Sequence, residues 1–418
     1  MGRKARTSTG PASTITLRLS PEELILLDEL THQHGLHTRS DLLRLGMRSL
    51  AGSVITPKVS ASHLVERLSR RKDDLAIERI QEGETLLLAS ELEACSAEEI
   101  ETMLLPAVRL LIQTHVQMYG WFYPTCSESV ADILQSVRAN AKGPPYSGIS
   151  RTGVDFLRAR FRSFWSTYRG PVDSTEDPAR LSSVLRHLLG LSTARKPWNI
   201  TLQVLRRGFF LQHMTVSFFR PCVAASIYRK WTGDIQKPRV WDPSAGFGAR
   251  MLGFFSMYPD GIYCANEPAK LTFTDLESLG GEMPGAVELT KQGSEFASFE
   301  PDSLDLVFTS PPYFSTEKYF NEPGQCWVEY PTVESWREKQ VIPTLKAAFS
   351  GLKSQGHAIF NINQAHRDTF LLVARDVGFE PVKEEVLVLR RDPLAQGKRF
   401  RKDPAATKSE PILVFRKP

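Results

Sequence analysis

The C-terminal half of the chain alternates short β-rich runs with helical stretches, and this alternation constrains the fold more than any other feature. The runs lie at residues 239–242, 262–266, 286–289, 305–309, 357–362, 382–389 and 411–415. Strands that alternate with helices predict an α/β fold with a mostly parallel, Rossmann-like sheet. The last two runs are joined by a loop instead of a helix, so we expect one antiparallel edge strand. Such sheets bind ligands at the carboxyl ends of their strands.

The first two strands end in residues suited to a ligand. Residues 242–248 (DPSAGFG) form a strand-to-helix turn in which two glycines let the backbone approach a ligand, and the helix start offers free N–H groups to an anion. Met251 replaces the third glycine of the dinucleotide fingerprint, so taken alone the turn is also typical of tight packing. Glu267, after the second strand, is placed to hold a ribose diol.

The fourth strand ends at residues 309–313 (TSPPY). Two prolines fix an extended backbone and remove two N–H donors, which leaves carbonyl oxygens directed away from the strand end. Ser310 before them and Tyr313 after them would form a slot that accepts hydrogen bonds from an amino group and stacks a flat ring. A rigid turn is the alternative for this segment alone, but its place after a glycine-rich turn and an acidic strand end favours a functional site.

The turn and the TSPPY segment together resemble the S-adenosylmethionine (SAM)-dependent DNA amino-methyltransferases, over about residues 210–418. The resemblance implies that the turn holds the methionine end of SAM, that Glu267 binds the ribose hydroxyls and that Ser294 lies near the adenine. Phe219, in a segment similar to one that closes over the cofactor, would stack on it. The implied cofactor-binding residues are Phe219, Asp242, Pro243, Ser244, Ala245, Gly246, Phe247, Gly248, Glu267 and Ser294.

The same resemblance implies methyl transfer to N4 of cytosine or N6 of adenine in a nucleotide flipped out of the duplex. Tyr313 would stack on the base, while the Ser310 hydroxyl and the Pro311 carbonyl hold the amino hydrogens. Serine at position 310 is commoner in the cytosine-N4 enzymes, so cytosine is expected first and adenine second. No metal is required. The implied catalytic residues are Ser310, Pro311, Pro312 and Tyr313.

Residues 13–50 resemble the ribbon-helix-helix DNA-binding modules, because a strictly alternating strand (TITLRL) precedes two capped helical stretches. The resemblance implies that residues 1–52 bind DNA through Thr14, Thr16 and Arg18 and pair the chain into a homodimer. A dimerisation hairpin, or a capped helical pair packed on the rest of the chain, is the alternative.

Residues 60–205 have helical periodicity and form a candidate region for target recognition, followed by the methyltransferase domain at 206–418. Arginines and aromatic residues alternate at 156–165, which is typical of an amphipathic helix with buried aromatic rings and, less often, of nucleic-acid contact. A basic loop at 390–402, with Arg399 and Arg401, is expected to neutralise phosphates. Residues 317–327 are a candidate lid over the target base.

The amino-acid composition narrows the kinds of site, the cellular compartment and the partners that are expected. Five cysteines without a CxxC pattern argue against a zinc site and a disulfide framework, and Cys222 after Pro221 is expected to be a buried structural thiol. No apolar run reaches about 18 residues, so a cytoplasmic, nucleoid-associated protein is expected. A net charge of +5 permits DNA as a partner without requiring it.

Two other functions stay open. One is a DNA-binding regulator whose methyltransferase-like domain is not catalytic, and the other is methylation of RNA or protein. The predicted N-terminal module favours DNA.

Overall fold

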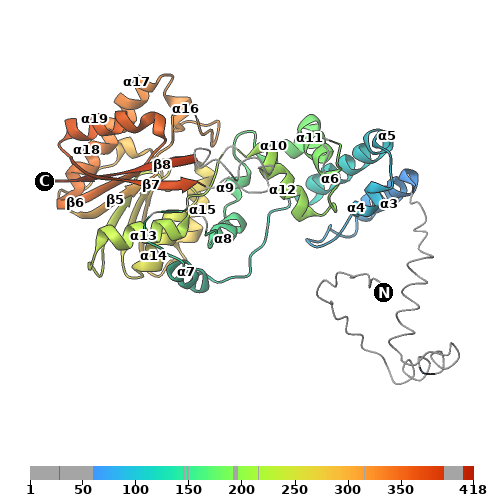
Figure 1. Cartoon of the computed structure of the whole chain (residues 1–418), viewed down its shortest axis with the longest axis horizontal. Helices are drawn as coiled ribbons and strands as arrows, with labels where there is room; N and C mark the ends of the chain where they lie inside the picture. Colours follow the sequence, from blue (N-terminus) through green and yellow to red (C-terminus); the bar gives the residue numbers. More distant parts are fainter. Residues whose placement is uncertain are drawn as a thin grey trace, which may run out of the picture. The chain divides into compact units, whose positions relative to one another are not determined.

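The computed structural model describes residues 28, 60–144, 146–147, 150–191, 196–214, 216–314, 316–389 and 408–418. The chain forms two compact units, Met1–Ser60 and Ala61–Pro418, and all elements below belong to the second (Figure 1). The predicted ribbon-helix-helix module with Thr14, Thr16 and Arg18, and the basic loop with Arg399 and Arg401, lie outside the described residues.

The described residues form an eight-stranded sheet in the order β1-β7-β8-β6-β5-β2-β3-β4. Its strands are β1 (Tyr146–Ser147), β2 (Arg239–Asp242), β3 (Ile262–Asn266), β4 (Ala286–Thr290), β5 (Leu304–Thr309), β6 (Leu352–Asn361), β7 (Glu380–Leu389) and β8 (Lys408–Arg416). All pairs are parallel except those of β8, which is antiparallel to β6 and β7. The predicted Rossmann-like, mostly parallel sheet is confirmed, and its antiparallel strand lies between β7 and β6.

The predicted strands agree with the observed ones most closely at β2 and β3, whose bounds are those expected. These strands are buried on both faces, as is typical of parallel strands covered by helices. By contrast, β6 begins five residues before the expected residue 357, because its first half is largely solvent-accessible and carries no apolar pattern. The two-residue strand β1 lies in the predicted helical region and was not expected.

Helices cover both faces of the sheet (Figure 1). On one side lie α7 (Val130–Ala139), α13 (Pro221–Thr232) and α14 (Ala249–Met257), and on the other α18 (Ile342–Gly351) and α19 (Arg367–Val377). Ser129 caps α7 by accepting a hydrogen bond from the Asp132 N–H. α13 begins with Pro221, whose fixed φ suits the first turn of a helix.

Other helices precede the sheet or connect its strands. Before β1 come α3 (Ala61–Asp74), α4 (Ala89–Glu93), α5 (Ala97–Glu99), η1 (Ile100–Leu104) and α6 (Leu105–Tyr119), and between β1 and β2 come α8 (Val154–Arg160), α9 (Arg162–Trp165), α10 (Pro171–Glu176), α11 (Pro178–Leu188) and α12 (Leu202–His213). Between strands come α15 (Lys270–Gly280), η2 (Ser294–Phe296), α16 (Cys326–Glu329), α17 (Val333–Trp336), η3 (Arg337–Val341) and η4 (Gln364–His366).

The predicted helical region contributes to the sheet layer. α7 packs against α13 and α14, and β1 extends the sheet beside β7. Further along, Arg206 of α12, the first residue of the predicted methyltransferase domain, forms an ion pair with Glu82 of the predicted helical region. The division at residue 206 stays a prediction, but residues 130–147 already pack with the elements that follow it.

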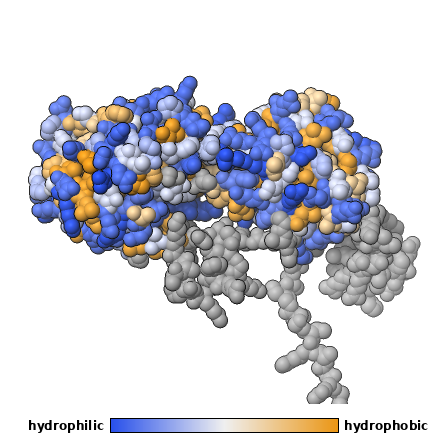
Figure 2. All heavy atoms as spheres, turned by 90° about the horizontal axis from the view of Figure 1, so that it is seen from above, coloured by the Kyte–Doolittle hydropathy of each residue, from blue (hydrophilic) through white to orange (hydrophobic). Residues whose placement is uncertain are grey.

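Surface and cysteine chemistry fit this layered core. Hydrophilic residues predominate on the face shown in Figure 2, with apolar residues in small groups between them. Among the described residues, no helix is long and apolar enough to cross a membrane. All five cysteines are unpaired. Cys222 is buried, as expected, and burial raises the pKa of its thiol.

The packing of α14 on α13 depends on Gly253, because a Cβ atom there would lie 2.6 Å from the Ala224 Cβ and 2.7 Å from the Pro221 carbonyl oxygen. We expect Gly253→Ala to lower the free energy of unfolding by about 2 kcal/mol, since a packed helix pair cannot absorb the added methyl group. Gly83→Ala is the matched control, because no atom lies within 4 Å of the corresponding Cβ. Denaturant unfolding measures both, and equal stabilities of the two variants would contradict the prediction.

Candidate functional site

A cavity of about 550 Å³ lies at the carboxyl ends of the parallel strands. The turn after β2, Glu267 after β3, Ser310 after β5 and Asn361 at the end of β6 all line it. Glu410 lines it too, because β8 runs antiparallel and its beginning meets the ends of its neighbours. The cavity is therefore where ligands of an open α/β sheet bind.

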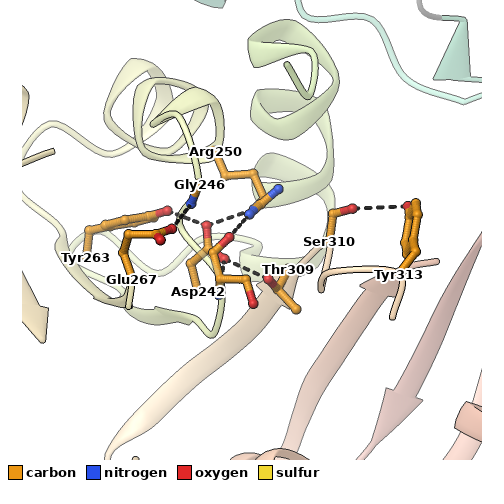
Figure 3. Close-up of polar contacts among 9 residues, drawn as sticks. Asp242, Gly246, Arg250, Tyr263, Glu267, Thr309, Ser310 and Tyr313 are labelled. Atoms are coloured by element: carbon orange, nitrogen blue, oxygen red, sulfur yellow. Dashed lines mark hydrogen bonds and ion pairs between the residues drawn. The ribbon is translucent and has the colours of Figure 1, made fainter. Parts of the chain in front are cut away.

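Asp242, the last residue of β2, is fully buried and does not line the cavity. Its carboxylate accepts hydrogen bonds from Arg250 Nε at 2.7 Å, Tyr263 Oη at 2.5 Å and Thr309 Oγ1 at 2.8 Å (Figure 3). We call these four residues the Asp242 cluster. They come from β2, α14, β3 and β5, so the cluster holds the glycine-containing turn against three strands. Asp242 positions the turn in this way, and its predicted cofactor contact stays a prediction.

Arg250 supplies the charge that a buried carboxylate needs. Burial alone would lower the pKa of its guanidinium, but Asp242 and Tyr263 outweigh burial and raise it. Arg250 also donates to the Ser244 carbonyl and lines the cavity. Sequence reasoning missed this residue, although a cation in the first turn of a helix opposes the helix dipole and therefore signals a specific partner.

The turn itself depends on two glycines. Gly246 and Gly248 have φ of 54° and 72°, in the left-handed region that favours glycine. A Cβ atom at Gly248 would lie 2.9 Å from side-chain atoms of Leu279 and Phe161, so this glycine also serves close packing. Residues 243–247 line the cavity, whereas Gly248 does not. Gly248 thus meets the packing interpretation, whereas the ligand-binding interpretation of Gly246, which lies on the cavity wall, stays a prediction.

Glu267 is 8% exposed and lines the cavity. Its carboxylate accepts the Gly246 N–H at 3.1 Å and the Ala269 N–H at 2.9 Å (Figure 3). Burial raises its pKa to about 7, against the opposing effect of these two hydrogen bonds. A carboxylate held on the backbone of the turn is suited to accept hydroxyl hydrogens from a ligand.

The remaining predicted cofactor residues surround the same cavity. Ser294 is buried, with its hydroxyl 2.8 Å from Thr344 Oγ1, and it lines the cavity. Phe219 lines it as well, edge-on to Phe308 with ring centroids 5.7 Å apart. The guanidinium of Arg250 lies 5.7 Å from the Phe219 ring centroid. The structure therefore brings both residues to the cavity wall.

Phe247 joins the turn to other parts of the chain. Its ring lies 5.3 Å from Phe164 of α9, 5.3 Å from Phe218 and 5.7 Å from Tyr319, centroid to centroid. Tyr319 belongs to the candidate lid, of which residues 317, 319, 320, 324 and 326 line the cavity. Its carbonyl accepts the Tyr168 N–H at 2.7 Å. The lid segment and the helical region thus meet at the turn.

The TSPPY segment supplies polar groups to the cavity wall at the end away from Glu267. Ser310 Oγ lies 3.2 Å from Tyr313 Oη (Figure 3), and Tyr313 donates to Glu410 Oε2 at 3.1 Å. Asn361 Nδ2 donates to the same oxygen at 3.2 Å. Ser310, Pro312 and Tyr313 line the cavity, whereas Pro311 does not. Tyr313 is 7% exposed, and burial followed by Glu410 raises the pKa of its hydroxyl.

Sequence reasoning missed Glu410 and Asn361. Asn361 is the next-to-last residue of the fifth expected strand, so a polar residue near a strand end was the available signal. Glu410 precedes the seventh run by one residue, and only the antiparallel direction of β8 brings it to the cavity.

The arginine and aromatic stretch at 156–165 has buried rings, which confirms the amphipathic interpretation. The helix breaks at Phe161, which separates α8 from α9. Arg160 forms an ion pair with Glu282, and Arg162 stacks over Tyr123. Arg158, in contrast, lines the cavity.

Comparisons with known proteins complete this description. No family model matches the chain, and no curated protein matches it. Among solved structures it is similar to TrmN from Thermus thermophilus (14% identity, TM-score 0.33), over 47% of this chain and about half, 49%, of that one. It is similar to a SAM-dependent methyltransferase from Methanosarcina mazei (12%, 0.33; 46% and 96% of the two chains). A third is a putative methyltransferase from Thermoplasma acidophilum (16%, 0.32; 48% and 76%).

The raised pKa of Glu267 predicts a pH-dependent stability. Between about pH 4.5 and 7 the unfolded chain loses a proton that the folded chain keeps. This carboxyl therefore makes the free energy of unfolding fall by roughly 3 kcal/mol as pH rises through that range, with little change above it. The difference between the free energies of unfolding of wild type and of Glu267→Gln should therefore decrease by the same amount as pH rises through this range. Denaturant unfolding at several pH values measures it. A difference that stays constant with pH would contradict the prediction.

Proposed function

We propose that this chain is a SAM-dependent methyltransferase that acts on the exocyclic amino group of a DNA base, with cytosine N4 as the first choice. The observation that carries the proposal is one cavity bounded by the glycine-containing turn, by Glu267 and by the TSPPY segment. The strand order supports it, because all three sites follow neighbouring parallel strands. The solved structures reported above add only a likeness of fold.

The first part of the cavity fits the cofactor. Residues 243–247 present backbone on the cavity wall, and Glu267 presents a carboxylate that is already fixed by two N–H groups. Glu267 would accept the ribose hydroxyls, and Phe219 and Ser294 would lie against the cofactor. SAM supplies a methyl group on a positively charged sulfur.

The TSPPY end fits an amino group. The nitrogen lone pair of a base amine is delocalised into the ring, so the amine needs acceptors that hold its hydrogens and direct the lone pair to the methyl carbon. The Ser310 hydroxyl is one such acceptor on the cavity wall. The Pro311 carbonyl would be the second, although Pro311 itself is not among the residues that line the cavity.

The transfer balances without a covalent enzyme intermediate. The amine nitrogen forms a bond to the methyl carbon while the carbon–sulfur bond breaks and its electron pair stays on sulfur. The nitrogen then carries one extra proton. Glu410 is a carboxylate on the cavity wall at this end, in hydrogen-bond contact with Tyr313, and would accept that proton directly or through water. Tyr313 is held in place by the same contact and would face the entering base.

Ser310→Ala tests the proposal. We expect it to lower kcat for DNA methylation by about 100-fold, because the variant loses an acceptor aligned with the reacting amine. SAM affinity, measured by calorimetry, should stay unchanged. Nucleoside mass spectrometry of DNA incubated with wild type and SAM should show N4-methylcytosine. Arg70→Ala, at an exposed α3 residue paired with Glu66, is the control and should retain wild-type activity.

Other outcomes of this experiment decide between the alternatives. N6-methyladenine without N4-methylcytosine would replace the choice of base but keep the class of reaction. Tritium transfer from labelled SAM to RNA or protein, with none to DNA, would overturn the DNA substrate. SAM and DNA binding with no transfer to any of the three would favour the regulator.

Glu410→Gln tests the proton acceptor. The amide keeps the size of the side chain but cannot take up a proton, so kcat should fall by about 10- to 100-fold with little change in KM. The acid limb of the pH–kcat profile should disappear together with the carboxyl group. Glu277→Gln, at an exposed residue of α15, is the matched control and should keep both kcat and the limb. A Glu410→Gln profile equal to that of wild type would exclude Glu410 from the proton transfer.

A further inference from the structure

Three arginines that the proposed reaction does not use line the cavity. Arg151 lies in the loop between β1 and α8, Arg158 lies in α8, and Arg220 precedes α13. We call them the arginine group. Arg151 and Arg158 come from one segment and Arg220 from another about 60 residues later, so the meeting of the two segments is a product of the fold.

The strand pairing locates the chain segment that carries Arg151. β1 pairs in parallel with β7, with Ser147 beside Val388. β7 lies on the opposite side of β5 from β2 and β3, the strands that lead to the turn and to Glu267. Leu387 and Leu389 of β7 also line the cavity. The segment that leads to Arg151 therefore belongs to the side of the cavity beyond the TSPPY segment.

Charge in the arginine group is poorly balanced. Asp155 is the carboxylate that the group contacts among the described residues, 2.8 Å from Arg158 Nη1 and 3.6 Å from Arg151 Nη2. Three guanidinium groups share this one contacting carboxylate, and the other carboxylates among the cavity-lining residues are Glu267, Glu317 and Glu410. Arg158 Nε is buried without a hydrogen-bond partner in the described part of the chain.

The electrostatic environment disfavours the charged form of two of these arginines. Burial, followed by the charge of Arg151, lowers the pKa of both Arg158 and Arg220. Arg158 also lies over the Phe210 ring, 4.7 Å from its centroid, which fixes the direction of its guanidinium. An anion in the cavity would relieve the repulsion and supply the missing acceptors.

We propose that Arg151, Arg158 and Arg220 bind the phosphates that flank the nucleotide whose base enters the cavity. The inference rests on the proposed function. It adds that the arginine group recognises the DNA backbone beside the target base. Guanidinium groups match phosphate oxygens in geometry and charge. Two flanking phosphates carry two negative charges and would offer acceptors to three guanidinium groups that share one contacting carboxylate. The carboxylate of SAM is the other possible anion, but it carries one charge and is accompanied by an ammonium group.

The test uses Arg151→Ala and Arg158→Gln in the full chain, with Arg70→Ala as the matched loss of a distant positive charge. Three quantities are measured: the affinity for SAM, the KM for DNA, and the salt dependence of DNA affinity by fluorescence anisotropy. We expect each cavity variant to raise KM for DNA by about 10-fold and to reduce the slope of log affinity against log salt by about 1. SAM affinity should equal that of wild type and of Arg70→Ala.

The outcomes separate this inference from the proposed function. Unchanged KM and salt slope in both variants would overturn the phosphate site, as would weaker SAM binding with unchanged DNA binding. Arg151 is half exposed, so Arg151→Ala keeps the test valid if Arg158→Gln unfolds at a lower temperature. Anisotropy needs no turnover. An arginine-dependent salt slope without methylation would therefore support the phosphate site and contradict the proposed function.

Discussion

The buried carboxylate of Asp242 is the interaction on which the rest of the site depends. A charge without water is tolerated only when it is paired and fully hydrogen-bonded, and Arg250, Tyr263 and Thr309 meet that condition from three different elements. The arrangement fixes where the turn leaves β2 and where the TSPPY segment leaves β5. The two ends of the cavity are thus held in register by one buried side chain that does not itself line the cavity.

The sequence predicts the sheet well because most strands end in recognisable residues and alternate with helices. β2 and β3 have the expected bounds, and the turn, Glu267 and Ser310 meet at one cavity as expected. β1 could not be predicted, because two residues show no periodicity. Asp242 was assigned to the ligand because a strand-end carboxylate has the same appearance in sequence whether its partners are protein or cofactor.

Glu410, Arg151 and Arg220 illustrate a second limit. Each lies near the cavity through a contact between strands or helices far apart in the chain, and such contacts leave no local pattern. The stretch at 156–165 shows the same limit in part, since its aromatic rings are buried as the helical period predicts. The helical period does not distinguish Arg158 from Arg160 and Arg162. Of these three arginines, the fold places Arg158 at the cavity.

The position of β8 has a consequence for synthesis on the ribosome. β2, β3, β4 and β5 are made early and can pair with one another, so the turn and Glu267 are able to assemble on the nascent chain. β6 and β7, in contrast, do not pair with each other, and residues 408–416 must emerge before β8 can fill the gap between them. The side of the cavity with the turn and Glu267 is therefore able to form first, and the side with Glu410 forms last.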